Sequence, residues 1–240
     1  MASDARGVSL EEGPRLYRWI AALTALLVWP FVRVDTLQLD VARRTRTAVV
    51  IANHRSLFDA AVGLIAFRRL HRYPRVIVAS HWFDRRWTGP LLRMAGAIPM
   101  DRDDPSVHLD AAKRLLDAGI PILILPEGRL SGETGVPTST GEFKTGAARL
   151  AAHCEVGVWP LAHVGTEDIW PRGDRRPRFG TRRSRRVVLL GHERIIEVDD
   201  DVRASTARLQ AEVVSLIEQA VPLLWTPPVE GQANDDTVAS

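Results

Sequence analysis

The chain has 240 residues, of which 45% are hydrophobic and 25% are charged, and its formal net charge is +3. These values are typical of one folded domain that buries a substantial core, and they exclude a disordered chain. The single cysteine, Cys154, excludes a disulfide framework and a cysteine-built zinc site within one chain. The first twelve residues are more acidic than basic, so no cleavable signal peptide is expected there.

The first predicted element is the apolar segment Trp19–Val32, with Arg15, Arg18 and Arg33 at its ends. It is shorter than the roughly 20 residues that a membrane-spanning helix needs. Tryptophan and phenylalanine near its ends, with arginines outside them, match residues that lie at the level of lipid head groups. We therefore expect an interfacial helix, with a buried core helix and a short re-entrant anchor as alternatives.

After this segment, short apolar runs alternate with segments of helical periodicity. The apolar runs are 47–52, 75–80, 97–102, 121–126, 156–165 and 186–195, and the helical segments are 55–70, 81–96, 104–119, 143–154 and 202–220. This alternation predicts a single α/β domain with a largely parallel central sheet flanked by helices. We divide the chain into an N-terminal membrane-interfacial segment (1–34), a main domain (35–225) and a disordered tail (226–240).

Two histidines are each followed five positions later by an aspartate: His54–Asp59 and His163–Asp168. Chance alone can produce such a spacing, so position in the sheet has to separate the pairs. Ligands collect at the carboxyl ends of the strands in α/β sheets. His54 comes directly after an apolar run and Asp59 lies early in the next helix, whereas His163 lies inside a run. We favour His54–Asp59 as the reactive pair and expect His163 to be a structural histidine, satisfied inside or beside the sheet.

Other strand ends also carry polar residues. Arg102 ends the run 97–102, and Glu127, Gly128 and Arg129 follow the run 121–126. Arginines at this edge suit a phosphate or another anion. The chain has no G-x-S-x-G, G-x-G-x-x-G, Walker A or H-E-x-x-H motif, and its histidines have no metal-ligand spacing. We therefore expect no metal site.

The segment 172–186 holds eight arginines and one aspartate, a local charge of +7. Because the whole chain carries only +3, the remainder is mildly acidic. Such a concentrated basic segment suggests an anionic partner, which we expect to be a membrane surface and not a nucleic acid. A solvated loop is the alternative.

Four blocks of the chain together resemble the glycerolipid acyltransferases, the family of 1-acylglycerol-3-phosphate acyltransferase. They are NHRSLFD (53–59), GAIPMDR (96–102), LPEGRLS (125–131) and VWPLA (158–162). The first matches the N-H-x4-D block of the family, the second its block ending in arginine, and the third its P-E-G block. The fourth matches its short proline-containing block. The resemblance covers about residues 45–165.

The resemblance implies transfer of a fatty acyl group from acyl-CoA or acyl carrier protein to a lysophospholipid hydroxyl, without a further cofactor. His54 would be the general base and Asp59 would hold its imidazole. The residues implied for the acceptor and its phosphate are Arg102, Glu127, Gly128 and Arg129. It also implies a peripheral or monotopic enzyme on the cytoplasmic face of a membrane.

The third block departs from the family's commonest form, P-E-G-T-R-S. Arg129 replaces its threonine and Leu130 its arginine. The acceptor therefore stays open between lysophosphatidate and other lysophospholipids, or an alcohol or amine of a sugar or specialised metabolite. A non-catalytic module that binds anionic membranes is an alternative from another class.

Overall fold

The computed structural model describes residues 15–41, 47–100, 106–131, 138–181 and 185–224. The strands are β1 Val32–Leu37, β2 Val49–Ala52, β3 Arg75–Ala79, β4 Ile98–Met100, β5 Ile122–Ile124, β6 Val158–Val164 and β7 Arg185–Gly191. The helices are α1 Arg15–Val28, α3 Asp59–Arg69, α4 Thr88–Met94, α5 Ser106–Asp117, α6 Gly146–His153 and α7 Val202–Leu223, with the 3₁₀ turn η1 Ser80–Trp82.

The strands form one seven-stranded sheet in the order β1-β7-β6-β2-β5-β3-β4. Neighbouring strands pair in parallel, except that β6 and β7 are antiparallel. Helices connect most of the parallel strands, as the alternating sequence pattern requires. The prediction of an α/β fold with a largely parallel sheet is confirmed.

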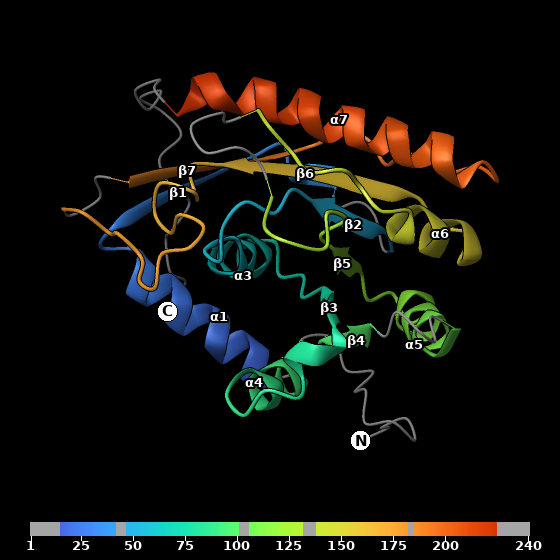
Figure 1. Ribbon diagram of the computed structural model, residues 1–240, viewed down its shortest axis with the longest axis horizontal. Coiled ribbons are helices and arrows are strands. Elements are labelled where there is room, and N and C mark those ends of the chain that lie inside the picture. The colour runs from blue at the N-terminus through green and yellow to red at the C-terminus, as the bar shows by residue number, and fades with distance from the viewer. Residues whose placement is uncertain (1–14, 42–46, 101–105, 132–137, 182–184, 225–240) are drawn as a thin grey trace.

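Helices cover both faces of the sheet (Figure 1). Successive strand residues point to opposite faces, and β2 follows this rule. Val49 and Ile51 are buried in the core cluster shared with α5, α6 and α7. Val50 and Ala52 are buried in the second cluster, which includes α3. All four residues of β2 are therefore buried, and the strand lies at the centre of the domain.

The N-terminal apolar segment differs from our prediction at its C-terminal end. The helix ends at Val28, and Val32 already pairs with Arg185 of β7 in the sheet. Pro30 explains the break, because proline disfavours helical geometry in the residue before it and lacks an amide hydrogen. The last residues of the segment 1–34 thus belong to the sheet. The tail 226–240 lies outside the described residues.

The order of the strands brings three loops together. β2 lies between β6 and β5 and is parallel to both, so the carboxyl ends of the three strands share one edge. The loops that leave this edge contain residues 53–58 after β2, 125–131 after β5 and 165–170 after β6. These loops and the residues beside them form the candidate site.

Candidate active site

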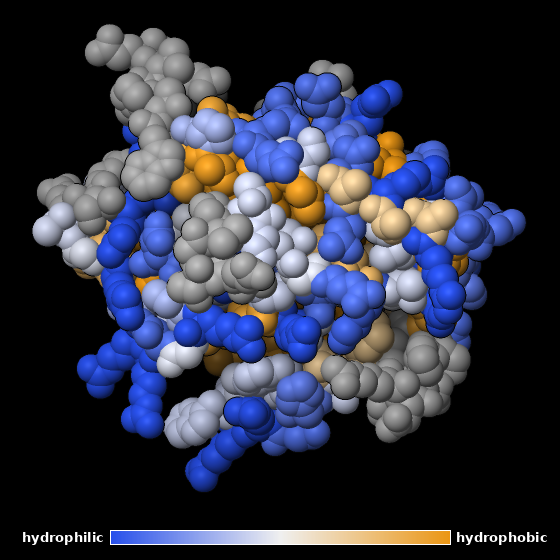
Figure 2. All heavy atoms as spheres, turned by 45° about the horizontal axis from the view of Figure 1, so that its top comes forward, coloured by the Kyte–Doolittle hydropathy of each residue, from blue (hydrophilic) through white to orange (hydrophobic). Residues whose placement is uncertain are grey.

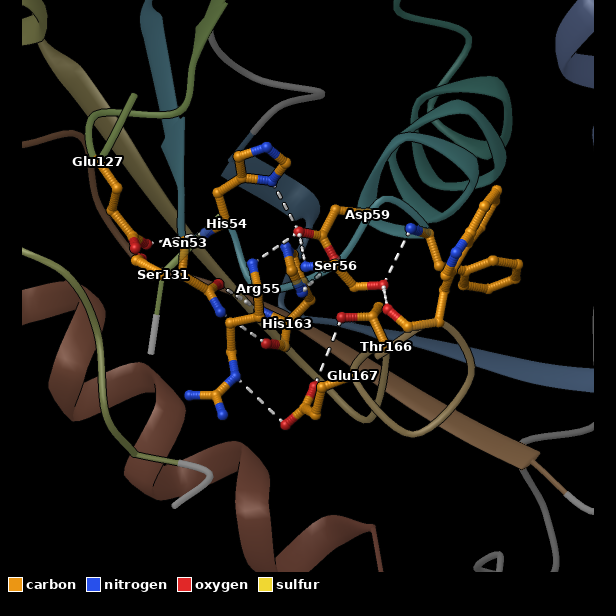
Figure 3. Close-up of polar contacts among 12 residues, drawn as sticks. Asn53, His54, Arg55, Ser56, Asp59, Glu127, Ser131, His163, Thr166 and Glu167 are labelled. Carbon is orange, nitrogen blue, oxygen red and sulfur yellow. Dashed lines mark hydrogen bonds and ion pairs between the residues drawn. The ribbon is translucent and has the colours of Figure 1, made fainter. Parts of the chain in front are cut away.

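The structure brings the side chains of His54 and Asp59 together. Nδ1 of His54 lies 2.9 Å from Oδ2 of Asp59, the first residue of α3. The Asp59 side chain is 3% exposed, whereas that of His54 is 21% exposed. No described residue hydrogen-bonds to the other ring nitrogen, Nε2, which points away from the residues drawn in Figure 3. His54 therefore presents one nitrogen to a buried carboxylate and the other outward.

Asp59 also shapes the loop that carries His54. Its Oδ2 accepts hydrogen bonds from the backbone N–H of Arg55 at 2.8 Å and of Ser56 at 2.9 Å. The Ser56 hydroxyl accepts from the N–H of Phe58 at 3.0 Å and donates to the carbonyl of Trp170 at 2.8 Å. These bonds satisfy amide groups of the loop that precedes α3, whose N-cap residue Phe58 has no side-chain capping bond. The same carboxylate thus orients the imidazole and fixes the loop.

The pKa of Asp59 lies below its ordinary value. Burial raises this pKa, but three effects that lower it are together larger. They are the electrostatic influence of His163, the hydrogen bond from His54 and the hydrogen bond from the Ser56 amide. Hydrogen bonds and positive partners stabilise the charged form of a carboxylate. Asp59 is therefore a carboxylate at neutral pH. A carboxylate is the form that can stabilise a protonated imidazole.

Glu127 holds the backbone of His54. Oε1 of Glu127 accepts from the N–H of His54 at 2.8 Å, and Oε2 accepts from the N–H of Gly141 at 3.0 Å. The carbonyl of His54 in turn accepts from the N–H of Ser131 at 2.8 Å. Burial raises the pKa of Glu127, although its two backbone hydrogen bonds oppose this effect. We expected Glu127 to face the acceptor, but the structure buries it behind His54, with 2% of the residue exposed.

The other residues that we expected to bind the acceptor are Gly128, Arg129 and Arg102. Gly128 has a φ of 64°, and a Cβ there would lie 2.8 Å from Nζ of Lys144. The left-handed backbone favours glycine, whereas the end of the flexible Lys144 side chain could move aside. Arg129 is exposed on the same loop. Arg102 lies outside the described residues.

Two residues of the first block have roles that its spacing did not indicate. The Asn53 amide group accepts from the N–H of His163 and donates to the carbonyl of His163, each at 2.9 Å. Nε of Arg55 lies 3.3 Å from Oε1 of Glu167, and Nη1 donates to the carbonyl of Ser139. These side chains tie the His54 loop to β6 and to the loop after it. All of these partners lie more than 80 residues away, so local spacing carries no signal for them.

His163 lies on the other side of Asp59 (Figure 3). Its side chain is 4% exposed, and its Nδ1 is 3.7 Å from Oδ1 of Asp59. Neither ring nitrogen has a hydrogen-bond partner among the described residues. Asp168, the aspartate at the expected spacing, is exposed. His163 is buried in the sheet as expected, but it is not satisfied there, and the carboxylate beside it is Asp59.

This arrangement suits proton transfer. An imidazole with one nitrogen on a carboxylate and the other exposed can take a proton from a bound hydroxyl group. Within the described part of the chain, no three His, Cys, Asp or Glu side chains are grouped so as to hold a metal ion. The paired imidazole and the exposed Arg129 on the neighbouring loop are groups that can support acid–base chemistry on an anionic substrate.

Comparison with known proteins identifies the family. The family profile described as Acyltransferase matches residues 33–164, more than half of the chain. The chain belongs to the acyltransferase family. Together with the curated relatives described next, this match confirms the resemblance to glycerolipid acyltransferases.

Curated relatives include plant enzymes. The chain is 30% identical over 164 residues to the chloroplastic 1-acyl-sn-glycerol-3-phosphate acyltransferase LPAT1 of Arabidopsis thaliana, covering 66% of this chain and 44% of that protein. It is 29% identical to the chloroplastic 1-acyl-sn-glycerol-3-phosphate acyltransferase BAT2 of Brassica napus, covering 66% of this chain and 45% of that protein. The chain thus spans less than half the length of these relatives.

A solved structure supports the fold. The crystal structure of the 1-acyl-sn-glycerophosphate (LPA) acyltransferase PlsC from Thermotoga maritima superposes with a TM-score of 0.66 at 20% sequence identity. The match covers 88% of this chain and 82% of that chain. The shared architecture therefore includes most of both chains.

Proposed function

We propose that the protein transfers a fatty acyl group from an acyl thioester to the hydroxyl group of a lysophospholipid. The thioester is acyl-CoA or an acyl group attached to acyl carrier protein, and no further cofactor takes part. The observation that carries this proposal is the contact between His54 and the buried Asp59, with the second ring nitrogen pointing outward, in a member of the acyltransferase family. The names of the relatives, 1-acyl-sn-glycerol-3-phosphate acyltransferases, support a lysolipid acceptor.

In the proposed mechanism, Nε2 of His54 takes the proton of the acceptor hydroxyl as its oxygen attacks the thioester carbonyl. A neutral alcohol is too weak an acid to react at neutral pH without such a base. The tetrahedral intermediate then expels the thiolate. The thiolate takes the proton from the imidazolium and leaves as the free thiol. Asp59 stabilises that imidazolium and fixes the ring orientation. The oxygen–acyl bond forms in the first step and the sulfur–acyl bond breaks in the second, and no acyl-enzyme is needed.

We assign the acceptor's phosphate to Arg129, with Arg102 as a second candidate. Arg129 is exposed two residues after Glu127, whose carboxylate holds the His54 backbone. A guanidinium group binds phosphate oxygens through two parallel hydrogen bonds. Placing the phosphate here would put the acceptor close to His54. Glu127 has a supporting role in this proposal, since both its oxygens are occupied by backbone amides.

We also propose that the protein works at an anionic membrane surface. The large apolar side chains exposed on α1 are Trp19, Leu23, Leu26 and Leu27, and those on α4 or just before it are Trp87, Leu91 and Met94. Trp19 is 73% exposed and Trp87 is 81% exposed. Apolar residues on the outward side of a helix, with arginines nearby, are typical of interfacial helices. Exposed arginines nearby are Arg15, Arg18, Arg85, Arg86 and Arg93.

The part of the arginine-rich segment 172–186 around Phe179 lies close to both the end of α1 and the candidate site. The ring of Phe179 is 5.2 Å from that of Phe31 and 6.1 Å from that of Phe58, the neighbour of Asp59. Arg178 pairs with Asp174 and Arg186 pairs with Asp35, so part of the segment's charge is compensated within the protein. Arg172, Arg175 and Arg176 are exposed. This proximity supports a site that opens near the lipid surface.

The opposite side of the domain has a different character. Figure 2, in which the α7 side is turned toward the viewer, shows mainly hydrophilic residues with smaller hydrophobic areas among them. Within the part of the chain that the structure describes, no helix is long and apolar enough to cross a membrane. A membrane-bound orientation would thus place α1 and α4 at the lipid and α7 away from it.

The test is to incubate the purified full-length protein with acyl-CoA or acyl carrier protein and single lysolipids of defined head group. Thioester consumption is followed by thiol release, and the product by lipid mass spectrometry. We expect thiol release to depend on a lysophospholipid and to match diacyl product one to one. Thiol release only with a sugar, alcohol or amine acceptor would replace the lysolipid assignment. Vesicle binding with no thiol release under any condition would leave a non-catalytic membrane module.

A further inference from the structure

His163 is a buried polar group beside the reactive pair that the proposed mechanism does not use. The residue is 3% exposed, and its two ring nitrogens have no hydrogen-bond partner among the described residues. A buried polar ring of this kind destabilises a fold relative to an apolar residue of similar size. A leucine would fill this position at lower cost. The position of the ring is therefore best explained by what lies beside it.

What lies beside it is the second oxygen of Asp59. Oδ2 of Asp59 receives three donors, from Nδ1 of His54 and the backbone amides of Arg55 and Ser56. Oδ1 receives none from the described residues, and Nδ1 of His163 is 3.7 Å away from it. The carboxylate therefore lies between two imidazoles, one on each oxygen (Figure 3).

The fold fixes where the His163 ring can go. β6 runs parallel to β2, and Ala52, the last residue of β2, pairs with Leu161. The Asn53 side chain then continues the link between the two chains by bonding both backbone groups of His163. Leu161 lies in the core cluster that contains α3, and alternate strand residues share a face, so His163 faces α3 as well. Asp59 begins that helix.

We propose that His163 is a positioning residue, which holds Asp59 through Oδ1 so that Oδ2 stays on His54. The inference rests on the proposed function for its effect on turnover but not for the contact itself. With a proton on Nδ1, the ring presents an N–H toward Oδ1. The present separation of 3.7 Å exceeds a hydrogen bond, and contacts of this kind shorten when a reactive complex forms. Asp59 would then be held by donors on both oxygens as the imidazolium develops.

Two substitutions separate this role from a purely structural one. His163→Leu fills the same space without a donor. His163→Asn places an amide nitrogen near the position of Nδ1 and restores the donor. Three measurements are made on the full-length protein: turnover with saturating substrates, thermal unfolding, and the low-field proton resonance of the His54 Nδ1–H in protein labelled with ¹⁵N-histidine. Loss of that resonance in His54→Ala assigns it.

We expect His163→Leu to lower kcat about ten-fold, the effect of one lost charge-assisted contact, with KM for both substrates unchanged. Its Tm should equal or exceed that of the wild type, because an unpartnered polar ring has been removed. The His54 resonance should broaden or shift in His163→Leu, and His163→Asn should recover both the resonance and most of the turnover.

The resonance keeps this proposal separate from the proposed function. If the protein transfers no acyl group at all, the resonance still reports whether His163 positions Asp59 and His54. An unchanged resonance and an unchanged kcat in His163→Leu would overturn the proposal. So would a loss of turnover that His163→Asn fails to recover while its Tm remains that of the wild type.

Discussion

The backbone N–H of His54 donates to Oε1 of Glu127 across 2.8 Å, so the carboxylate of the third sequence block holds the histidine of the first. The other oxygen of Glu127 accepts from Gly141. The backbone at Gly141 and the loop that carries His54 therefore share one buried carboxylate. A change at Glu127 would therefore displace His54 through its backbone, although the His54 side chain itself is unchanged.

Glu127→Gln should consequently lower kcat more than it raises KM for the acceptor. The glutamine amide keeps one oxygen that can accept a hydrogen bond. Its NH₂ group cannot accept, so it leaves the backbone N–H of either His54 or Gly141 without a partner. An unmatched buried donor of this kind costs about 1–3 kcal/mol. We expect the free energy of unfolding to fall by that amount and kcat by about ten-fold or more. A rise in acceptor KM with kcat unchanged would instead return Glu127 to the acceptor site.

His54→Ala should lower turnover by about 10²–10⁴-fold, the usual effect of removing a positioned general base. The backbone contacts of His54 do not depend on the ring, so the fold should persist, although Asp59 loses one hydrogen-bond partner. His153→Ala is the matched control, because His153 is exposed at the end of α6. Thiol release measures both variants. Equal activity of His54→Ala and His153→Ala would exclude His54 as the base.

Asp59 should give the wild-type protein a pH-dependent stability that Asp59→Asn lacks. The pKa of Asp59 is lowered in the folded state, so its charged form stabilises folding above the ordinary Asp pKa of about 4. That contribution is lost as the pH falls through the lower folded pKa. Urea unfolding of both proteins between about pH 3 and about pH 7 gives the difference. It should be largest near neutral pH and shrink in acid. A difference that does not vary with pH would contradict a charged, paired Asp59.

The sequence was a good guide to the pair at residues 54 and 59 because both residues belong to one loop and the start of the next helix. Alternating apolar runs likewise predicted the parallel strands, since burial on both faces leaves a continuous apolar signature. β1 was missed because it directly follows the apolar helix, and Pro30 alone marks the boundary. The surroundings of Glu127 and His163 could not be predicted locally. Their partners come from other strands, and only the strand order brings them into contact.

Arg129→Ala should weaken the use of a phosphate-bearing acceptor. Each charge-assisted contact with phosphate is worth enough to raise KM about ten-fold or more, and kcat/KM should fall accordingly. Arg149→Ala, which removes an exposed arginine from α6, is the control for charge alone. KM for the thioester should be the same in both variants. If Arg129→Ala changes the two substrates equally, the phosphate does not bind at this residue.

Attachment to lipid should depend on the outward side of α1. Leu26 is 68% exposed, so Leu26→Glu should leave the fold intact but place a charge at the proposed lipid contact. Ala211→Glu adds the same charge to an exposed position of α7 and is the matched control. In vesicle flotation, we expect Leu26→Glu to reduce binding to neutral and anionic vesicles alike, and Ala211→Glu to change neither.

Charge and burial should be separable in the same flotation experiment. Arg175→Gln combined with Arg176→Gln should reduce binding mainly on anionic vesicles, because each basic residue near such a surface contributes on the order of 1 kcal/mol. Salt should remove this difference, since a Debye length at physiological ionic strength is only about 8 Å. Leu26→Glu should keep its defect at high salt, because burial of an apolar side chain is not screened. Activity on detergent-dispersed acceptor should persist in every one of these variants, since none of them touches His54 or Asp59. If flotation is unaffected throughout, the protein meets its acceptor in water, and the exposed apolar residues of α1 have another partner.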